Sequence, residues 1–303
     1  MSLQIGAVFP TCEIGNDPAA IRDYAQAAEE LGYSHITTYD HVLGAVHEGR
    51  EPALTGPYRE TDPFHEPFVL FGYLAGVTQR IRLVTGVLIL PQRQTVLVAK
   101  QAAELAVLSG GRFTLGVGTG WNWVEYESLG EDYASRGSRL DEQLELLRQL
   151  WESPVVDFEG EHHRVDRTGL LPLPPSRIPI WMGGFSPPAV RRAARIGDGF
   201  LFGAAFPPML KLCSLLHAEL EKTGRGEGFE IDVILHYSEG EEAWRSLAEK
   251  WKQAGATHFS MRSMDTGVAL TGEKPAGLKT VQDQIGALER FISVVRDVGP
   301  DPR

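Results

Sequence analysis

The sequence has little cysteine, no long apolar run and no excess of positive charge, and each lack argues against a class of protein. Its 303 residues include two cysteines, Cys12 and Cys213, far apart and without the spacing of a metal site or a disulfide framework. No apolar run approaches the roughly 18 residues that a membrane span needs. The formal net charge of −11 disfavours a long nucleic-acid backbone as partner. We therefore expect neither a nucleic-acid nor a membrane partner.

The first residues also lack the basic and apolar regions of a signal peptide, because Met1 leads directly into the strand-like segment LQIGAVFP. With so few cysteines, this predicts a reduced, cytoplasmic protein. The 33 glycines and 19 prolines are spread along the chain, which indicates many short turns rather than a disordered tail.

What the sequence does contain is a regular alternation of strand and helix patterns. The predicted strands are 3–9, 34–40, 81–90, 112–118, 179–183, 199–203, 229–237 and 257–263. The predicted helices are 17–32, 67–79, 95–111, 139–151, 187–197, 208–222, 241–255 and 280–299. Eight alternating pairs predict an α/β fold of the TIM (β/α)8 type, formed as a single domain over 1–303. The rival, a doubly wound open sheet, is weakened because no G-x-G-x-x-G follows the first strand.

Residues 153–178 interrupt this alternation. The segment is rich in proline and has no long periodic run, so we interpret it as an insertion between the fourth helix and the fifth strand, with a small hairpin. It contains His162 and His163, which invite a metal interpretation. A metal hydrolase barrel usually has a His-x-His after its first strand, where this chain has Phe9, Pro10 and Thr11. We therefore expect no metal site.

The active site of such a barrel lies at the carboxyl ends of its strands. Asp40 and His41 follow the second strand, where a histidine can move a proton near neutral pH. The alternative is a buried polar pair that ties down a loop. Gly86 lies inside the third strand, which indicates a bulge, a close approach by a ligand, or barrel packing.

Further candidates follow the later strands. Gly183, Gly184, Phe185 and Ser186 precede a helix, where unpaired amides favour a phosphate, although Ser186 also suits a plain N-cap. Trp121 and Trp123 follow the fourth strand and either wall a flat ring or pack their loop down. His236 ends the seventh strand and is a candidate for the substrate pocket. His35 and His258 begin strands, far from this end.

Taken together, these segments resemble the luciferase-like (LLM class) flavin and deazaflavin oxidoreductases, most closely their coenzyme F420-dependent branch. The resemblance covers about residues 3–203. Its carriers are TYDHV, RLVTGVLILPQRQTVLVAKQAAELAVLSGGRFTLGVGTGWNWVEYESLG, RGSRLDEQLELLRQLW and PIWMGGFSPPAVRRAARIGDGF.

The resemblance implies a cofactor ring across the strand ends, buttressed by a non-proline cis peptide between Gly86 and Val87. It places Asp40 and His41 at the reactive edge of the ring. The implied cofactor-binding residues are Asp40, Gly86, Val87, Ile89, Thr119, Gly120, Gly183, Gly184, Phe185 and Ser186. Sugar-phosphate dehydrogenases of this family carry a glutamate where this chain has Trp121. The departure argues against a sugar-phosphate oxidation that uses that acid.

Three functions stay open on this basis. In the first, coenzyme F420 exchanges a hydride with a small organic substrate, and His41 supplies or accepts the proton. In the second, reduced FMN in the same site activates oxygen as in a monooxygenase. In the third, the protein is a non-catalytic flavin-binding subunit. The resemblance also implies a homodimer. The long loop 42–66 is expected to become ordered over a bound ligand and to determine which substrates are accepted.

Overall fold

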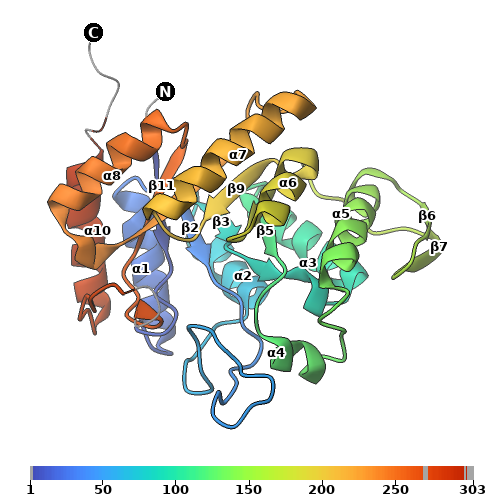
Figure 1. Cartoon of the computed structure of the whole chain (residues 1–303), viewed down its shortest axis with the longest axis horizontal. Helices are drawn as coiled ribbons and strands as arrows, with labels where there is room; N and C mark the ends of the chain where they lie inside the picture. Colours follow the sequence, from blue (N-terminus) through green and yellow to red (C-terminus); the bar gives the residue numbers. More distant parts are fainter. Residues whose placement is uncertain (1–2, 269–271, 297, 299–303) are drawn as a thin grey trace.

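The computed structural model of the chain describes residues 3–268, 272–296 and 298. A closed ring of parallel strands forms its centre, surrounded by helices (Figure 1). The strands are β1 (Gln4–Val8), β2 (His35–Thr38), β3 (Arg82–Thr85), β4 (Leu88–Ile89), β5 (Phe113–Gly118), β8 (Ile180–Gly183), β9 (Gly199–Phe202), β10 (Glu230–His236) and β11 (His258–Arg262). Their order is β3-β2-β1-β11-β10-β9-β8-β5, and a β3–β5 pairing closes the ring. The predicted TIM barrel is confirmed.

The third predicted strand is split into two pieces. β3 pairs with β2 and β5, whereas β4 pairs with β5 alone. Between them lie Gly86 and Val87, joined by a cis peptide bond as the resemblance implied. The chain then turns through a short 3-10 helix, Leu90–Gln92, into α3. The split brings the Val87 side chain to the carboxyl end of the barrel.

The helices follow the expected alternation with one addition. They are α1 (Pro18–Glu30), α2 (Pro67–Val77), α3 (Thr95–Leu108), α4 (Trp123–Ser128), α5 (Arg136–Glu152), α6 (Pro187–Ile196), α7 (Pro207–Thr223), α8 (Glu241–Gln253) and α10 (Val281–Val295). The short helix α4 was not predicted. The last helix ends at Val295, and residues 297 and 299 of the predicted helix lie outside the described part of the chain.

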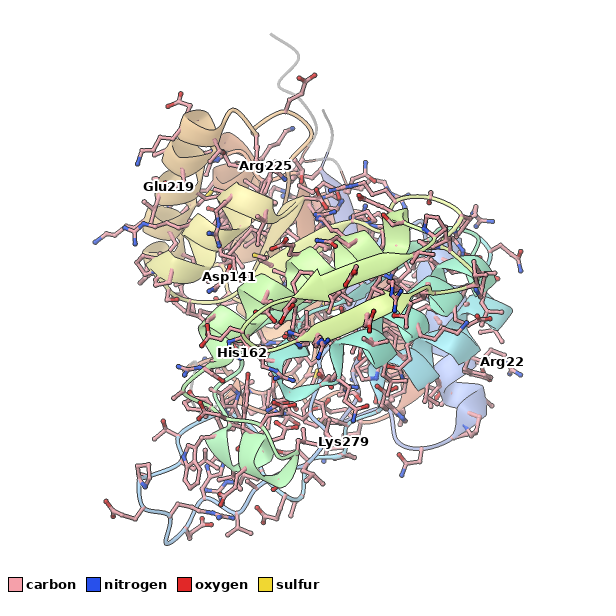
Figure 2. The ribbon with its side chains drawn as sticks, turned by 90° about the vertical axis from the view of Figure 1, so that its right-hand side faces the viewer. Arg22, Asp141, His162, Glu219, Arg225 and Lys279 are labelled. Atoms are coloured by element: carbon pink, nitrogen blue, oxygen red, sulfur yellow. The ribbon has the colours of Figure 1, made fainter. Side chains whose placement is uncertain are left out.

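The predicted insertion contains the expected hairpin, β6 (Val156–Glu159) paired with β7 (Arg164–Thr168). It lies beside α5, as Figure 2 shows near the labelled His162. The His163 ring bonds to Thr95 Oγ1 at 2.6 Å and to Glu142 Oε1 at 2.7 Å. His163 therefore fastens the hairpin to α3 and α5. Among the described residues, no group of three or more His, Cys, Asp or Glu side chains is arranged to hold a metal ion.

The interior of the barrel is filled with side chains, so a ligand has to bind at one end. The apolar filling consists of Val8, Val84, Trp181, Leu201, Ile234 and Met264. Toward the strand starts lies a polar layer, in which His35 Nε2 and Ser260 Oγ both bond to the buried carboxylate of Asp232. His35 and His258 belong to that layer, at the end opposite the candidate site. No helix in the described ranges is long and apolar enough to span a bilayer.

Candidate active site

Asp40 joins three elements at the carboxyl end of the barrel. Its Oδ2 accepts a hydrogen bond from the backbone of Ile89 at 2.9 Å, and its Oδ1 bonds to Arg93 Nη2 at 2.7 Å. The Asp40 side chain is 1% exposed. Both carboxylate oxygens are thus engaged with β4 and the turn before α3. Asp40 fixes the strand ends in place rather than presenting a free acid.

His41 lies next to Asp40 and faces a different partner. Its Nδ1 is 3.1 Å from Glu125 Oε2, and its side chain is 9% exposed. In the described residues, His41 Nε2 makes no hydrogen bond. Because an ionised carboxylate only accepts, the neutral ring carries its proton on Nδ1 and a lone pair on Nε2. This is the arrangement of a histidine oriented by an acid for proton transfer.

Glu125 is the residue that the sequence prediction missed. Its Oε1 accepts hydrogen bonds from the amides of Val42 at 2.5 Å and Leu43 at 3.1 Å. Burial raises the pKa of Glu125. The hydrogen bond and the charge of His41, together with the hydrogen bonds of these two amides, lower it by more, so the net pKa lies below its usual range. Glu125 is therefore an anion at neutral pH, although only 1% of its side chain is exposed.

The position of Glu125 follows from the start of α4. Asn122 caps the helix by accepting a hydrogen bond from the Glu125 amide at 3.2 Å, which places Glu125 in the first turn. In Asn-x-x-Glu the glutamate normally reaches back to the cap. Here it reaches across to the residues after β2 instead. The Asn-x-x-Glu pattern was the available signal for this helix start.

Aromatic rings surround His41. The rings of Tyr58 and Phe64 each lie 5.0 Å from the His41 ring, and that of Trp121 lies at 5.6 Å. Trp121 also covers Gly56, where a Cβ would come within 2.1 Å of the indole. The loop 42–66 lies beside α4 (Figure 1), and its Tyr58 and Phe64 rings contact His41. Trp121 thus packs the loop down, one of the two roles that the sequence suggested, and its ring also lies near His41.

Val87, Gly118 and Gly183 pack together at the ends of neighbouring strands and form a small platform. A Cβ at Gly118 would lie 2.6 Å from one Val87 methyl group, and a Cβ at Gly183 would lie 2.7 Å from the other. Gly120 is left-handed, with φ +63°, and packs on Ile89. The missing side chains of these glycines thus let Val87 and Ile89 pack closely against the backbone at the ends of β5 and β8.

The turn after β8 differs in one respect from the predicted phosphate site. Ser186 is the N-cap of α6, but its side chain makes no capping hydrogen bond. The first two helical residues are Pro187 and Pro188, which have no N–H to offer. The Ala189 amide bonds to Ser186 O at 3.1 Å. The donors left for an anion are the Phe185 and Ser186 amides and the Ser186 hydroxyl, which form no hydrogen bond within the described residues.

Three other predicted site residues are engaged inside the protein. The carbonyl of Thr119 accepts a hydrogen bond from Tyr126 at 2.7 Å. His236 is buried, and its ring nitrogens bond to Ser238 Oγ at 2.7 Å and Met264 O at 2.9 Å. Trp123 begins α4, and its Nε1 is buried without a partner in the described residues. The Trp123 indole N–H is thus an unpaired donor in the described part of the chain.

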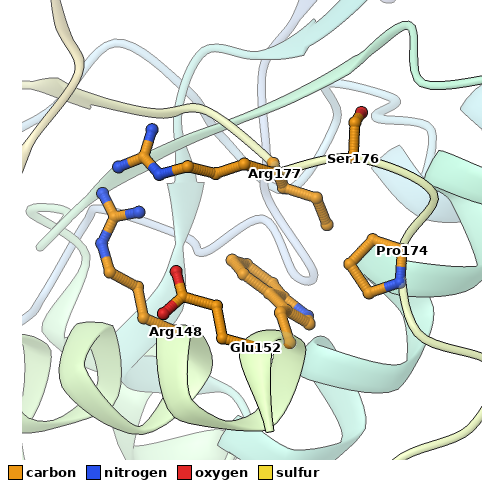
Figure 3. Close-up of a pocket in the computed structure, with 7 residues that line it drawn as sticks. Arg148, Glu152, Pro174, Ser176 and Arg177 are labelled. Carbon is orange, nitrogen blue, oxygen red and sulfur yellow. The ribbon is translucent and has the colours of Figure 1, made fainter.

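Two hollows lie outside the strand ends. One, of about 240 Å³, borders Glu125 and the loop residues after His41. The other, of about 200 Å³, lies between α5 and residues 174–178 (Figure 3). Its Arg148 and Arg177 both bind Asp198, at 3.0 and 2.8 Å. This second hollow is remote from His41 and belongs to the packing of the insertion.

The fold is that of a known class of oxidoreductase. The luciferase-like monooxygenase family model matches residues 4–282, and the chain belongs to this family. An uncharacterized protein of Mycobacterium tuberculosis is 40% identical over 216 residues, or 69% of this chain and 74% of that protein. A Nakamurella multipartita protein named F420-dependent glucose-6-phosphate dehydrogenase is 34% identical over 299 residues, or 93% and 84% of the two chains.

Solved structures show the same fold at lower identity. An F420-dependent secondary alcohol dehydrogenase in complex with an F420-acetone adduct has a TM-score of 0.74 at 20% identity, covering 98% of this chain and 100% of that one. EDTA monooxygenase from a Chelativorans species has a TM-score of 0.70 at 15% identity, covering 94% and 98%. At these identities the likeness shows the fold alone.

Proposed function

We propose that the protein is a coenzyme F420-dependent oxidoreductase that transfers a hydride to or from a small organic substrate, with His41 moving the accompanying proton. The observation that carries this proposal is the buried His41–Glu125 pair beside a glycine platform at the strand ends. The relative named F420-dependent glucose-6-phosphate dehydrogenase supports this choice of cofactor. FMN, with oxygen as co-substrate, is the alternative.

The residues present fit such a cofactor. Val87 packs closely against Gly118 and Gly183, and this platform would form the surface behind a planar ring. The free amides of Phe185 and Ser186 would bind the phosphate. When bound, the deazaflavin supplies or accepts the hydride.

The remaining chemistry falls to this chain. Glu125 holds the proton on Nδ1 of His41, so that Nε2 can take a proton from a substrate hydroxyl or return it to a carbonyl. Tyr58, Phe64 and Trp121 exclude water from the ring. Trp121 stands where the sugar-phosphate dehydrogenases of this family carry a glutamate. The acid that bonds to His41 here is Glu125, four residues later in the chain.

The test is a titration of the purified protein with coenzyme F420 and with FMN, read by fluorescence quenching. We expect coenzyme F420 to bind at least about tenfold more tightly, a difference of about 1.4 kcal/mol. Gly183→Ala should weaken binding by a similar factor, because the added methyl displaces Val87. Gly72→Ala on α2, where a Cβ meets nothing within 4 Å, is the matched control. Tighter binding of FMN would replace the deazaflavin assignment by the monooxygenase one.

We also propose that the protein forms a homodimer through α2 and α3. Val69 on α2 is 73% exposed, and Leu97 and Leu108 on α3 are 52% and 60% exposed. Apolar side chains so exposed on adjacent helices are typical of an interface. We expect Val69→Glu combined with Leu97→Glu to convert a dimer of the 33.3 kDa chain into a monomer in sedimentation velocity. Val155→Glu, at an equally exposed site in the insertion, should leave the dimer intact. A monomeric wild type would contradict the proposal.

A further inference from the structure

The 89–93 turn, which follows β4, holds the residue before His41 in place. The Ile89 amide donates a hydrogen bond to Asp40 Oδ2 at 2.9 Å, and Arg93 Nη2 bonds to Asp40 Oδ1 at 2.7 Å. Both members of this ion pair are mostly buried, so water competes little for either of them. Because His41 is the next residue in the chain, the position of the turn determines where the His41 side chain starts.

The same turn also reaches the acid that orients the His41 ring. Gln92 Nε2 donates to Glu125 Oε2 at 3.4 Å, and this oxygen bonds to His41 Nδ1 at 3.1 Å. Gln92 and Glu125 are both buried. The carboxylate can only accept, so Gln92 presents its NH2 group to Glu125. Two separate contacts thus connect the turn with His41, one through Asp40 and one through Glu125.

A single buried side chain on α5 holds the turn. Gln143 Nε2 donates to the carbonyl oxygens of Leu90 at 3.1 Å and Arg93 at 3.2 Å. It also donates to Thr95 Oγ1 at 2.9 Å. Carbonyl oxygens cannot donate, so the Gln143 amide has one orientation that forms these bonds. Its Oε1 has no hydrogen-bond partner within the described part of the chain, so Gln143 acts here as a donor alone.

The turn has little support from the helix that it enters. The N-cap residue of α3, Gln94, forms no side-chain capping hydrogen bond. A side chain at this position commonly fixes the start of a helix. The bonds from Gln143 on the neighbouring helix are therefore the side-chain contacts that hold the chain between β4 and α3.

The hairpin of the insertion determines how Gln143 and Thr95 share their protons. Thr95 Oγ1 lies 2.6 Å from His163 Nε2, and His163 Nδ1 lies 2.7 Å from Glu142 Oε1. Burial lowers the pKa of His163, so its ring is neutral at neutral pH and carries its proton on Nδ1, toward the carboxylate. Nε2 then accepts the Thr95 hydroxyl proton, which leaves the Thr95 oxygen to accept from Gln143.

We propose that Gln143 is a positioning residue for the active site: it holds the 89–93 turn, and through the turn the two carboxylates that place His41. His163 of the insertion supports Gln143 through Thr95. The proposal rests on the proposed function only in calling His41 the reacting group. A reacting group has to stay within about 0.5 Å of its productive position, and neighbours fixed by buried hydrogen bonds provide this precision.

The first measurement is the protonation pattern of the His41 ring, followed by nuclear magnetic resonance of cofactor-free protein with isotope-labelled histidine. In alkaline solution the wild type should carry the ring proton on Nδ1 alone. Gln143→Met removes the donor and keeps a side chain of similar length, so both tautomers of His41 should appear. Gln149→Met is the matched control, because Gln149 lies on the same helix and bonds to Glu145 at the surface. It should give the wild-type spectrum.

Amide hydrogen exchange shows whether the effect is local. The amides of Ile89, Val42 and Leu43 bond to the two carboxylates, whereas the Thr257 amide is bonded at the strand starts. In Gln143→Met, the first three should gain at least about tenfold in exchange rate relative to the Thr257 amide.

A control for simple destabilisation comes from the same helix. Leu150→Ala, two turns beyond Gln143, creates a cavity in the core and removes no donor. It should accelerate exchange at all of these amides alike, and the His41 ring should keep its proton on Nδ1.

Gln92→Leu tests one of the two branches alone. The substitution removes the donor to Glu125 and leaves the bonds of Asp40 in place. Exchange at the two amides bonded to Glu125 should therefore rise, whereas exchange at the amide bonded to Asp40 should not. The His41 ring should again show both tautomers.

His163→Phe tests the contribution of the insertion and replaces Gln143→Met if that variant fails to fold. The Thr95 hydroxyl loses its acceptor, so its contact with Gln143 becomes looser. The amides bonded to the two carboxylates should gain at least about threefold in exchange rate relative to the Thr257 amide. An unchanged ratio would overturn the role of the insertion.

Two results with Gln143→Met would overturn the positioning role. One is a His41 ring that keeps its proton on Nδ1 alone, and the other is a uniform acceleration of exchange like that of Leu150→Ala. Both are separable from the proposed function, because no cofactor is present in these measurements. Failure of the wild type to bind coenzyme F420 would refute the proposed function and leave the exchange pattern as it is.

Discussion

His41→Ala should lower kcat by about 10²–10⁴-fold for any substrate that the wild type turns over, the usual contribution of a positioned acid–base group. The reason is geometric: Nε2 of His41 is the unbonded end of a histidine whose other nitrogen is held by Glu125. The affinity for coenzyme F420 should stay unchanged, because the platform at Val87 and the amides near Ser186 are not altered. Single-turnover absorbance of the deazaflavin separates the chemical step from binding.

His217→Ala is the control for this experiment. His217 lies on α7 and bonds to the carbonyl of Ala254, remote from the strand ends. It should keep wild-type kcat and KM. If His41→Ala also keeps wild-type turnover while binding the cofactor, the assigned role of His41 is wrong. If neither wild type nor variant shows turnover with bound cofactor, the interpretation as a non-catalytic flavin-binding subunit gains ground.

Glu125→Ala should lower the free energy of unfolding by roughly 3 kcal/mol, because three buried donors lose a charged acceptor and each unsatisfied donor costs about 1–3 kcal/mol. The substitution leaves the Val42 and Leu43 amides and Nδ1 of His41 without their acceptor. Urea unfolding followed by circular dichroism measures the change. Glu127→Ala, an exposed position on the same helix, should alter stability by no more than about 0.5 kcal/mol.

The same residue gives a pH dependence with a defined sign. The pKa of Glu125 is lower in the folded protein than the ordinary value of 4.5. Its contribution to stability is therefore fully present above pH 4.5 and is lost as the pH falls below that value. The stability difference between wild type and Glu125→Gln should shrink over the same range. A difference that is constant with pH would show that the carboxylate is not the source.

The alternation of elements in this sequence was enough to predict the barrel, because the strands are short apolar runs and most of them are closed by Gly or Pro. Strand ends were also enough to bring His41, Gly118 and Gly183 to one place, since a parallel barrel puts all its carboxyl ends on one face. The sequence did not single out Glu125, because α4 has only six residues and is too short to show a periodic pattern. A sequence pattern shows which groups are present, but not which partner each one selects.

The two sides of Asp40–His41 illustrate that limit. The sequence left open whether the pair is reactive or structural. In the structure Asp40 bonds to β4, whereas His41 packs against the ring of Tyr58. For His236, the sequence indicated the right position at a strand end. It could not show that both ring nitrogens are bonded inside the protein.

The wedge formed by Val87 has a consequence for how such a protein diversifies. Its two methyl groups fill the space that side chains at Gly118 and Gly183 would require. A larger side chain at any one of these three positions therefore does not fit without a change at another. A lineage that enlarges either glycine has to shrink residue 87 at the same time, so the three positions form one evolutionary unit. New substrates should accordingly be acquired through the loop 42–66, while the platform stays as it is.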